Sequence, residues 1–160
     1  MRTHSFDVVP LKGVGPVHLA MSRSQVHEAL AVPLPEPHRE GSQADGPDAF
    51  FESAFQVSYD GDGRAEYIEI YRDGPFTTLY GGVDVFATGA EELVRLVAQD
   101  GPFDPDNPEH GFSYVFPSLE LSLWRRCIPE EHGEECLEDT GGGFETIGVG
   151  KRGYYSNPSR

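Results

Sequence analysis

Alternation of apolar and polar residues predicts a β-hairpin in the first half of the chain. Apolar side chains alternate over residues 55–59 and again over 65–71, where Ile68 and Ile70 share one face. The turn between the two runs, residues 60–63, reads DGDG. Asp and Gly tolerate the positive φ of tight turns, and a period of two on both sides of such a turn is typical of a hairpin.

A period near 3.6 residues predicts two helices, each preceded by a capping box. Ser22 and Gln25 form the first box, and Thr88 and Glu91 form the second. In such a box the first side chain accepts from a backbone N–H of the first turn, and the fourth residue reaches back. Apolar stripes follow both boxes, and the first helix is expected to end near Ala31.

Short alternating runs predict the other strands, over 16–21, 82–87, 113–117, 119–126 and 144–150. The chain is expected to form a single domain over 1–160. The order of strand, helix, Pro-rich loop and hairpin occurs in 11–72 and again in 80–155, either by internal duplication or without one. We expect an α+β fold in which an antiparallel sheet carries two helices on one face and leaves the other face open.

The charge balance bears on partners, because 27 acidic residues face 12 basic ones and the formal net charge is −15. A field of that sign repels phosphate backbones, so nucleic-acid binding is not expected, whereas encounter with a basic protein would be faster. The same charge also fits a protein with no selected partner. No run is apolar enough for a membrane helix, and two cysteines make no disulfide framework. A cytoplasmic location is therefore expected.

Three motifs suggest chemistry, and each has a simpler interpretation. Asp60 and Asp62 match the first two calcium ligands of an EF-hand loop, but Arg64 stands at the next ligand position, which favours a plain turn. Residues 148–153 match G-x-G-x-x-G but lack the helix and the second strand of a dinucleotide site, so close backbone packing is expected. Cys127, His132 and Cys136 form the third motif.

The segment that contains Cys127, His132 and Cys136 has three alternatives that the sequence leaves open. Two thiolates and an imidazole are zinc ligands, although the spacing is not that of a zinc finger. A disulfide between the cysteines would close the loop instead. The third alternative is an acidic loop with two ordinary cysteines. No other motif indicates a metal, a cofactor or a catalytic nucleophile, and the six histidines are expected to be solvated.

The candidate site is the open face of the predicted sheet. Six side chains are expected there, three from each of two strands: Tyr67, Glu69, Tyr71, Glu120, Trp124 and Arg126. Exposed Trp, Tyr and Arg are enriched at binding hot spots. The tyrosines and Trp124 would be apolar anchors, the two glutamates would meet cations, and Arg126 would meet an anion. Alternatively, loops, the C-terminal tail or a second copy of the chain cover the face.

Three stretches of the sequence carry a resemblance, and they read GVGPVHLAMSRSQVHEAL, LSLWR and IGVGKRGYY. They resemble a group of small uncharacterised bacterial proteins associated with immunity-type proteins of toxin systems. The tandem order of helix and hairpin is also similar in topology to beta-lactamase inhibitory protein. The likeness to beta-lactamase inhibitory protein, which presents a concave sheet face to its target, implies a sheet face that binds a protein, and neither resemblance implies a catalytic residue.

The sequence therefore predicts a non-enzymatic binding protein, of immunity or inhibitor type, whose open sheet face binds a protein partner. One alternative is a small enzyme or a small-molecule-binding domain with a pocket on the same face. Another is a homo-oligomeric domain without a ligand. A shallow face would favour protein binding, and a deep pocket with a buried carboxylate or histidine would favour the enzyme.

Overall fold

The computed structural model describes residues 4–32, 47–128 and 143–155, and every structural statement below concerns these residues. Two helices and two sheets give the predicted α+β fold. The larger sheet has the strand order β4 (Asp48–Phe50), β5 (Phe55–Tyr59), β6 (Ala65–Tyr71), β11 (Thr146–Gly150), β10 (Leu121–Trp124), β9 (Ser113–Phe116). All neighbours in this sheet are antiparallel.

The hairpin β5–β6 forms as predicted, and its turn is explained by hydrogen bonds within the turn. Asp60 Oδ1 accepts from the backbone N–H groups of Asp62 at 2.9 Å and Arg64 at 3.0 Å. Gly63 has φ +74°, which glycine adopts without steric cost. The bond from the Arg64 N–H holds the pKa of Asp60 below its usual value. The carboxylate therefore serves the turn.

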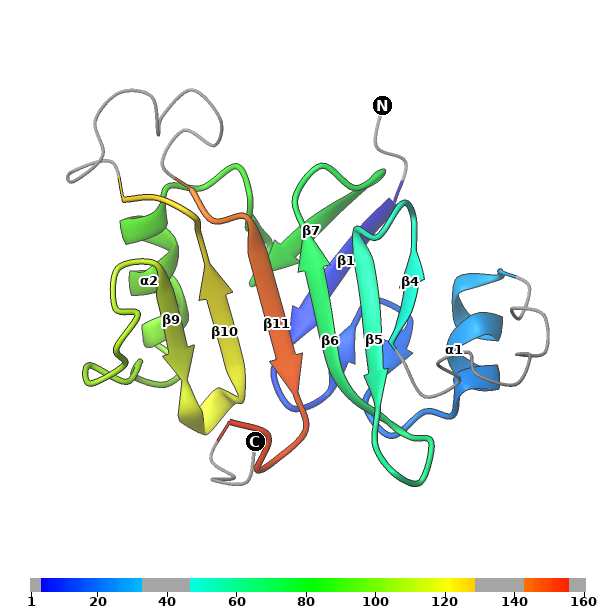
Figure 1. The fold of residues 1–160 in the computed structure, drawn as a ribbon. Helices are drawn as coiled ribbons and strands as arrows, with labels where there is room; N and C mark the ends of the chain where they lie inside the picture. Colours follow the sequence, from blue (N-terminus) through cyan, green and yellow to red (C-terminus); the bar gives the residue numbers. More distant parts are fainter. Residues whose placement is uncertain (1–3, 33–46, 129–142, 156–160) are drawn as a thin grey trace.

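A smaller sheet lies behind the larger one (Figure 1). Its strand order is β3 (Val17–His18), β2 (Gly13–Val14), β1 (His4–Val9), β7 (Phe76–Tyr80), β8 (Val83–Asp84), and β1 and β7 are parallel. Phe6 of β1 stacks on Phe76 of β7 with ring centroids 4.8 Å apart, and meets Phe55 of β5 edge-on at 5.8 Å. These rings join the two sheets. The sequence analysis did not anticipate the smaller sheet.

The two helices differ in how they begin. At α1 (Arg23–Leu30) the predicted capping box is confirmed, because Ser22 Oγ accepts from the Gln25 N–H at 3.2 Å and the Gln25 side chain accepts from the Ser22 N–H. At α2 (Ala90–Ala98) the predicted box is wrong. The Thr88 hydroxyl donates to the carbonyl of Asp84 at 2.6 Å, and Gly89 is the N-cap without a side-chain bond. Neither described helix has the length and apolar character that crossing a bilayer requires.

The core lies between the larger sheet and the elements behind it. One face of the larger sheet is apolar and fully buried. Strands from both halves of the chain contribute side chains to it: Ile68, Ile70, Leu121, Leu123, Ile147 and Val149. Leu93 and Val97 of α2 are buried in the same cluster. The helices therefore share the covering of this face with the smaller sheet.

The pairing of β6 with β11 joins the two halves at the centre of the larger sheet. The strand order on one side of this pair mirrors the order on the other. The smaller sheet is compatible with the same relation, because β2 is antiparallel to β1 and β7 is parallel to it, so β2 and β7 run in opposite directions on the two sides of β1. An internal duplication stays a prediction.

Candidate binding face

The face of the larger sheet that points away from the core holds four of the six predicted site residues. Because side chains alternate along a strand, Tyr67, Glu69 and Tyr71 of β6 point to the side opposite Ile68 and Ile70. Trp124 lies in register with Thr146, which lies in register with Tyr71. Adjacent strands are about 4.8 Å apart, so Trp124 and Tyr71 flank Thr146 in one row.

The C-terminal segment 151–155 covers one end of this face. The Tyr154 ring stacks on the Tyr67 ring with centroids 4.6 Å apart and an interplanar angle of 7°. The Tyr155 hydroxyl donates to the Tyr67 hydroxyl at 3.2 Å and lies 2.5 Å from Ser122 Oγ. Burial, reinforced by the Glu69 carboxylate, raises the pKa of Tyr67 to about 12. Tyr67 is therefore packed under the chain's own tyrosines.

Glu120 anchors this segment. It lies just before β10, is 4% exposed, and its carboxylate accepts from the N–H groups of Gly153 at 2.8 Å and Tyr155 at 2.9 Å. Lys151 adds ion pairs to Asp60 at 3.2 Å and Glu66 at 3.5 Å. The Glu120 carboxylate thus binds the chain's own backbone, which explains why a charged residue is buried here.

Two glycines of the G-x-G-x-x-G motif make room for the tyrosine rings. A Cβ atom at Gly148 would overlap the hydroxyl of Tyr67, and one at Gly150 would lie 2.6 Å from Cβ of Tyr154. Glycine therefore lets both rings lie flat on β11, which confirms the predicted close packing at the end of this strand.

The other end of the face is bare. Tyr71 is 36% exposed and Trp124 is 39% exposed, while Thr146 between them is 6% exposed. Burial, followed by the charge of Glu69 and a hydrogen bond to it, raises the pKa of Tyr71. Among the described residues the other large apolar side chains with comparable exposure are Val9 and Leu11, which lie on and just after β1. The rings of Tyr71 and Trp124 are thus both exposed on the outer face of the sheet, one on each side of Thr146.

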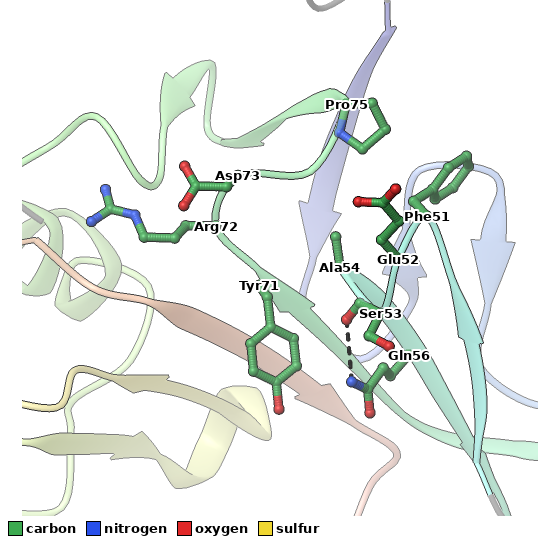
Figure 2. A pocket seen from close by; sticks show the side chains of 9 residues that line it. All are labelled: Phe51, Glu52, Ser53, Ala54, Gln56, Tyr71, Arg72, Asp73 and Pro75. Carbon is green, nitrogen blue, oxygen red and sulfur yellow. Dashed lines mark hydrogen bonds between the residues drawn. The ribbon is translucent and has the colours of Figure 1, made fainter. Parts of the chain in front are cut away.

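An open hollow of about 810 Å³ adjoins Tyr71 (Figure 2). Its lining comes from the β4–β5 turn and from the end of β6: Phe51, Glu52, Ser53, Ala54, Gln56, Tyr71, Arg72, Asp73 and Pro75. Most of these residues are exposed, so the hollow is shallow. Arg72 points away from it and donates to the carbonyl of Phe86 at 2.6 Å. The sequence analysis missed this hollow, because its two walls meet only after β5 and β6 pair.

The remaining predicted site residues lie outside the face or outside the described chain. Arg126 follows β10, is 56% exposed in its side chain, and pairs through Nε with Glu145 at 3.3 Å. Cys127 takes part in a disulfide bond. His132 and Cys136 lie outside the described residues, but a sulfur in a disulfide is not the thiolate that the zinc alternative requires, so the bond at Cys127 speaks against that alternative. In the described ranges no group of three or more His, Cys, Asp or Glu residues is placed to hold a metal ion.

A buried polar network at α1 was also missed. His27, expected to be solvated, is almost fully buried, and its Nε2 lies 3.0 Å from Asp48 Oδ2. The same oxygen accepts from the Tyr59 hydroxyl at 2.9 Å and pairs with Arg23 Nε at 3.0 Å. Arg23 and His27 are four residues apart, so they share one face of the helix. The spacing of Arg23 and His27 was the sequence signal that could have indicated the network. The network joins α1 to β4 and β5.

The structure is that of an α+β protein in which the chain's own segment 151–155 covers part of the outer face of the larger sheet. The chain matches no protein-family model, no curated protein and no solved structure.

Proposed function

We propose that this protein binds a basic protein partner through the bare end of its larger sheet. The observation that carries the proposal is the pair of exposed rings, Tyr71 and Trp124, in one row on either side of Thr146. Trp and Tyr dominate binding energy at interfaces because they bury a large area at low entropic cost. The two rings are the anchors of the interface, and Glu69 provides a charge beside them.

The shape of the site supports a protein partner over a small substrate. Small-molecule sites enclose most of their ligand, whereas Tyr71, Glu52 and Asp73 at the hollow are all exposed. The buried carboxylate Glu120 is occupied by backbone N–H groups of the C-terminal segment. A broad, shallow surface with exposed rings is the geometry of a protein interface.

Charge supports a basic partner. The formal net charge is −15, and Glu52, Glu69 and Asp73 lie around the exposed rings. Such a field accelerates encounter with a positively charged surface and disfavours acidic competitors. The inhibitor or immunity role adds that the partner is a toxin-type protein, and this step rests on the resemblance of the three sequence stretches described above.

A cytoplasmic site of action belongs to the proposal as well. The chain has two cysteines, too few for the disulfide framework typical of small secreted domains, and this favours the cytoplasm. The disulfide bond of Cys127 argues in the other direction, because disulfides are rare in that compartment. Fractionation of host cells tests the location independently of binding.

Affinity capture from host cells, followed by purification of the captured protein, tests the proposed function. The double variant Tyr71→Ala with Trp124→Ala should raise the dissociation constant by about 30-fold or more, because the loss of one hot-spot residue alone has an effect of about that size. The matched control is Val9→Ala with Leu11→Ala, which removes equally exposed apolar side chains elsewhere and should leave affinity unchanged.

Two results would contradict the proposal. One is a partner whose affinity is the same for both double variants. The other is self-association, seen by light scattering after size exclusion, that only the Tyr71 and Trp124 changes abolish. That second result would assign the face to a second copy of this chain.

A further inference from the structure

We propose that the hollow beside Tyr71 binds the guanidinium group of an arginine side chain presented by the partner. This inference rests on the proposed function and specifies the chemistry that the bare end recognises. It concerns the cavity lined by the β4–β5 turn and the end of β6.

The polar lining of the hollow is rich in acceptors. Glu52 and Asp73 belong to its two walls, and Figure 2 shows the Glu52 carboxylate turned toward the hollow and the Asp73 carboxylate at the rim, on the side of Arg72. The Gln56 amide nitrogen donates to the Ser53 carbonyl at 3.1 Å, so the amide oxygen of Gln56 is left as an acceptor. A guanidinium group has five N–H donors and no acceptor. The lining therefore complements a donor-only cation.

Among the described residues, no basic side chain forms an ion pair with these carboxylates. Arg72 is the basic residue of the lining, but it points away, bonded to the Phe86 carbonyl and lying over the Phe86 ring at 5.9 Å. Both carboxylates are thus available to an incoming charge.

The apolar lining favours arginine over lysine. The rings of Tyr71 and Pro75 line the same hollow as the carboxylates, and the Phe51 ring lies at its outer edge, packed edge-on against Phe76 with ring centroids 5.5 Å apart. A guanidinium group is planar, weakly hydrated and able to stack on rings while its edge bonds carboxylates, whereas an ammonium group is a compact and strongly hydrated charge. Rings and carboxylates in one cavity therefore select the planar cation.

The backbone of the hollow is held in an uncommon conformation. Phe51, Glu52 and Ser53 have φ +53°, +56° and +73°, and Asp73 has φ +71°, although none is glycine. Such angles are unfavourable for residues with a Cβ atom and persist where the surrounding fold imposes them. The two acidic side chains therefore start from imposed backbone positions at the rim.

Titration with N-acetyl-arginine amide, followed by amide-resolved NMR of the full chain, tests the inference without the partner. We expect saturable shifts confined to residues 51–56 and 71–75, with affinity in the millimolar range typical of one side chain. The citrulline derivative has the same shape without the charge and should cause no such shifts. The lysine derivative should bind at least about threefold more weakly.

The variant Glu52→Gln with Asp73→Asn should reduce arginine affinity about tenfold or more. Its matched control, Glu91→Gln with Glu92→Gln on the exposed side of α2, makes the same change of net charge and should leave affinity unchanged. Equal binding of the citrulline derivative, equal loss in both variants, or shifts spread over the whole surface would overturn the inference.

Failure of this inference is distinguishable from failure of the proposed function. If Tyr71→Ala with Trp124→Ala abolishes partner binding while Glu52→Gln with Asp73→Asn leaves it intact, the interface stands and the arginine site is wrong. If the arginine derivative binds in the hollow but Tyr71→Ala with Trp124→Ala leaves the affinity for the partner unchanged, the proposed interface is wrong.

Discussion

The two ends of the outer sheet face both carry aromatic side chains, but these are covered at one end and exposed at the other. At one end Tyr67 is packed under Tyr154 and Tyr155. At the other end Tyr71 and Trp124 are left exposed. Aromatic residues on the outer face of a strand are therefore not sufficient to mark a binding surface. The informative residues are those that the chain itself leaves bare.

The polar groups differ in the same way. The Glu120 carboxylate at the covered end is buried and accepts two backbone N–H groups. Glu52 and Asp73 at the bare end are exposed and lie at the rim of a hollow. A buried carboxylate that is fully hydrogen-bonded stabilises the fold, whereas exposed carboxylates without ion-pair partners add little stability and are available for binding.

Removing the anchor of the covered end should have the largest effect on stability. Glu120→Ala deletes two charge-assisted hydrogen bonds and leaves the N–H groups of Gly153 and Tyr155 without that acceptor. We expect a loss of about 3 kcal/mol in the free energy of unfolding, measured with urea. Glu120→Gln keeps one acceptor oxygen and should lose less. Equal stability of wild type and both variants would mean that the C-terminal segment adds nothing to the fold.

Alkaline pH should have the second-largest effect on stability, through the covered end of the face. The pKa of Tyr67 rises from 10.0 to about 12 in the folded chain. The unfolded chain therefore loses its proton first, and the stability due to Tyr67 is complete below pH 10 and is lost as the pH rises from about 10 to 12. One pKa unit corresponds to about 1.4 kcal/mol, so we expect a loss on the order of 2.5 kcal/mol.

The measurement for Tyr67 is the urea unfolding free energy across this pH range, compared between wild type and Tyr67→Phe. Tyr155 is hydrogen-bonded to Tyr67, so the difference between the two curves reports this pair, whereas the more distant tyrosines titrate in both proteins. We expect the variant to lose stability less steeply. Parallel curves would show that Tyr67 ionises in the folded state as readily as in the unfolded one.

A methyl group on β11 should have the smallest of the three effects. Gly148→Ala places a Cβ atom against the Tyr67 hydroxyl, and the ring must move away from Tyr154 to accommodate it. Such overpacking costs about 2 kcal/mol. Gly61→Ala is the control, because its Cβ would meet nothing within 4 Å, and its effect should stay within about 0.5 kcal/mol. Thermal unfolding of both variants checks the comparison.

Local patterns predicted the parts of the fold that depend on neighbours in sequence. The hairpin β5–β6 and the cap at Ser22 each arise within a few residues, so period and turn chemistry were sufficient to predict them. The cap at Thr88 failed because the hydroxyl found a carbonyl four residues earlier. The short strands β3 and β8 of the smaller sheet lie within the predicted strands 16–21 and 82–87. The sheet itself was missed because β1 and β7 were not predicted, and their parallel pairing joins segments far apart in the sequence.

The candidate face was only partly predictable for a different reason. Alternation along β6 correctly indicated which side chains leave the core. It gave no information on the contact between Tyr67 and Tyr154, which depends on the path of the chain after β11. His27 was missed in the same way, because its partner Asp48 belongs to another strand. Contacts between distant segments decide which polar and aromatic residues stay exposed.

The central position of β11 has a consequence for synthesis on the ribosome. Residues 146–150 pair with β6 on one side and β10 on the other (Figure 1). Until they emerge from the exit tunnel, the nascent chain holds two strands whose backbone groups await this partner, and such unpaired edges promote aggregation. The six-stranded layer is thus completed only after its other five strands have been synthesised.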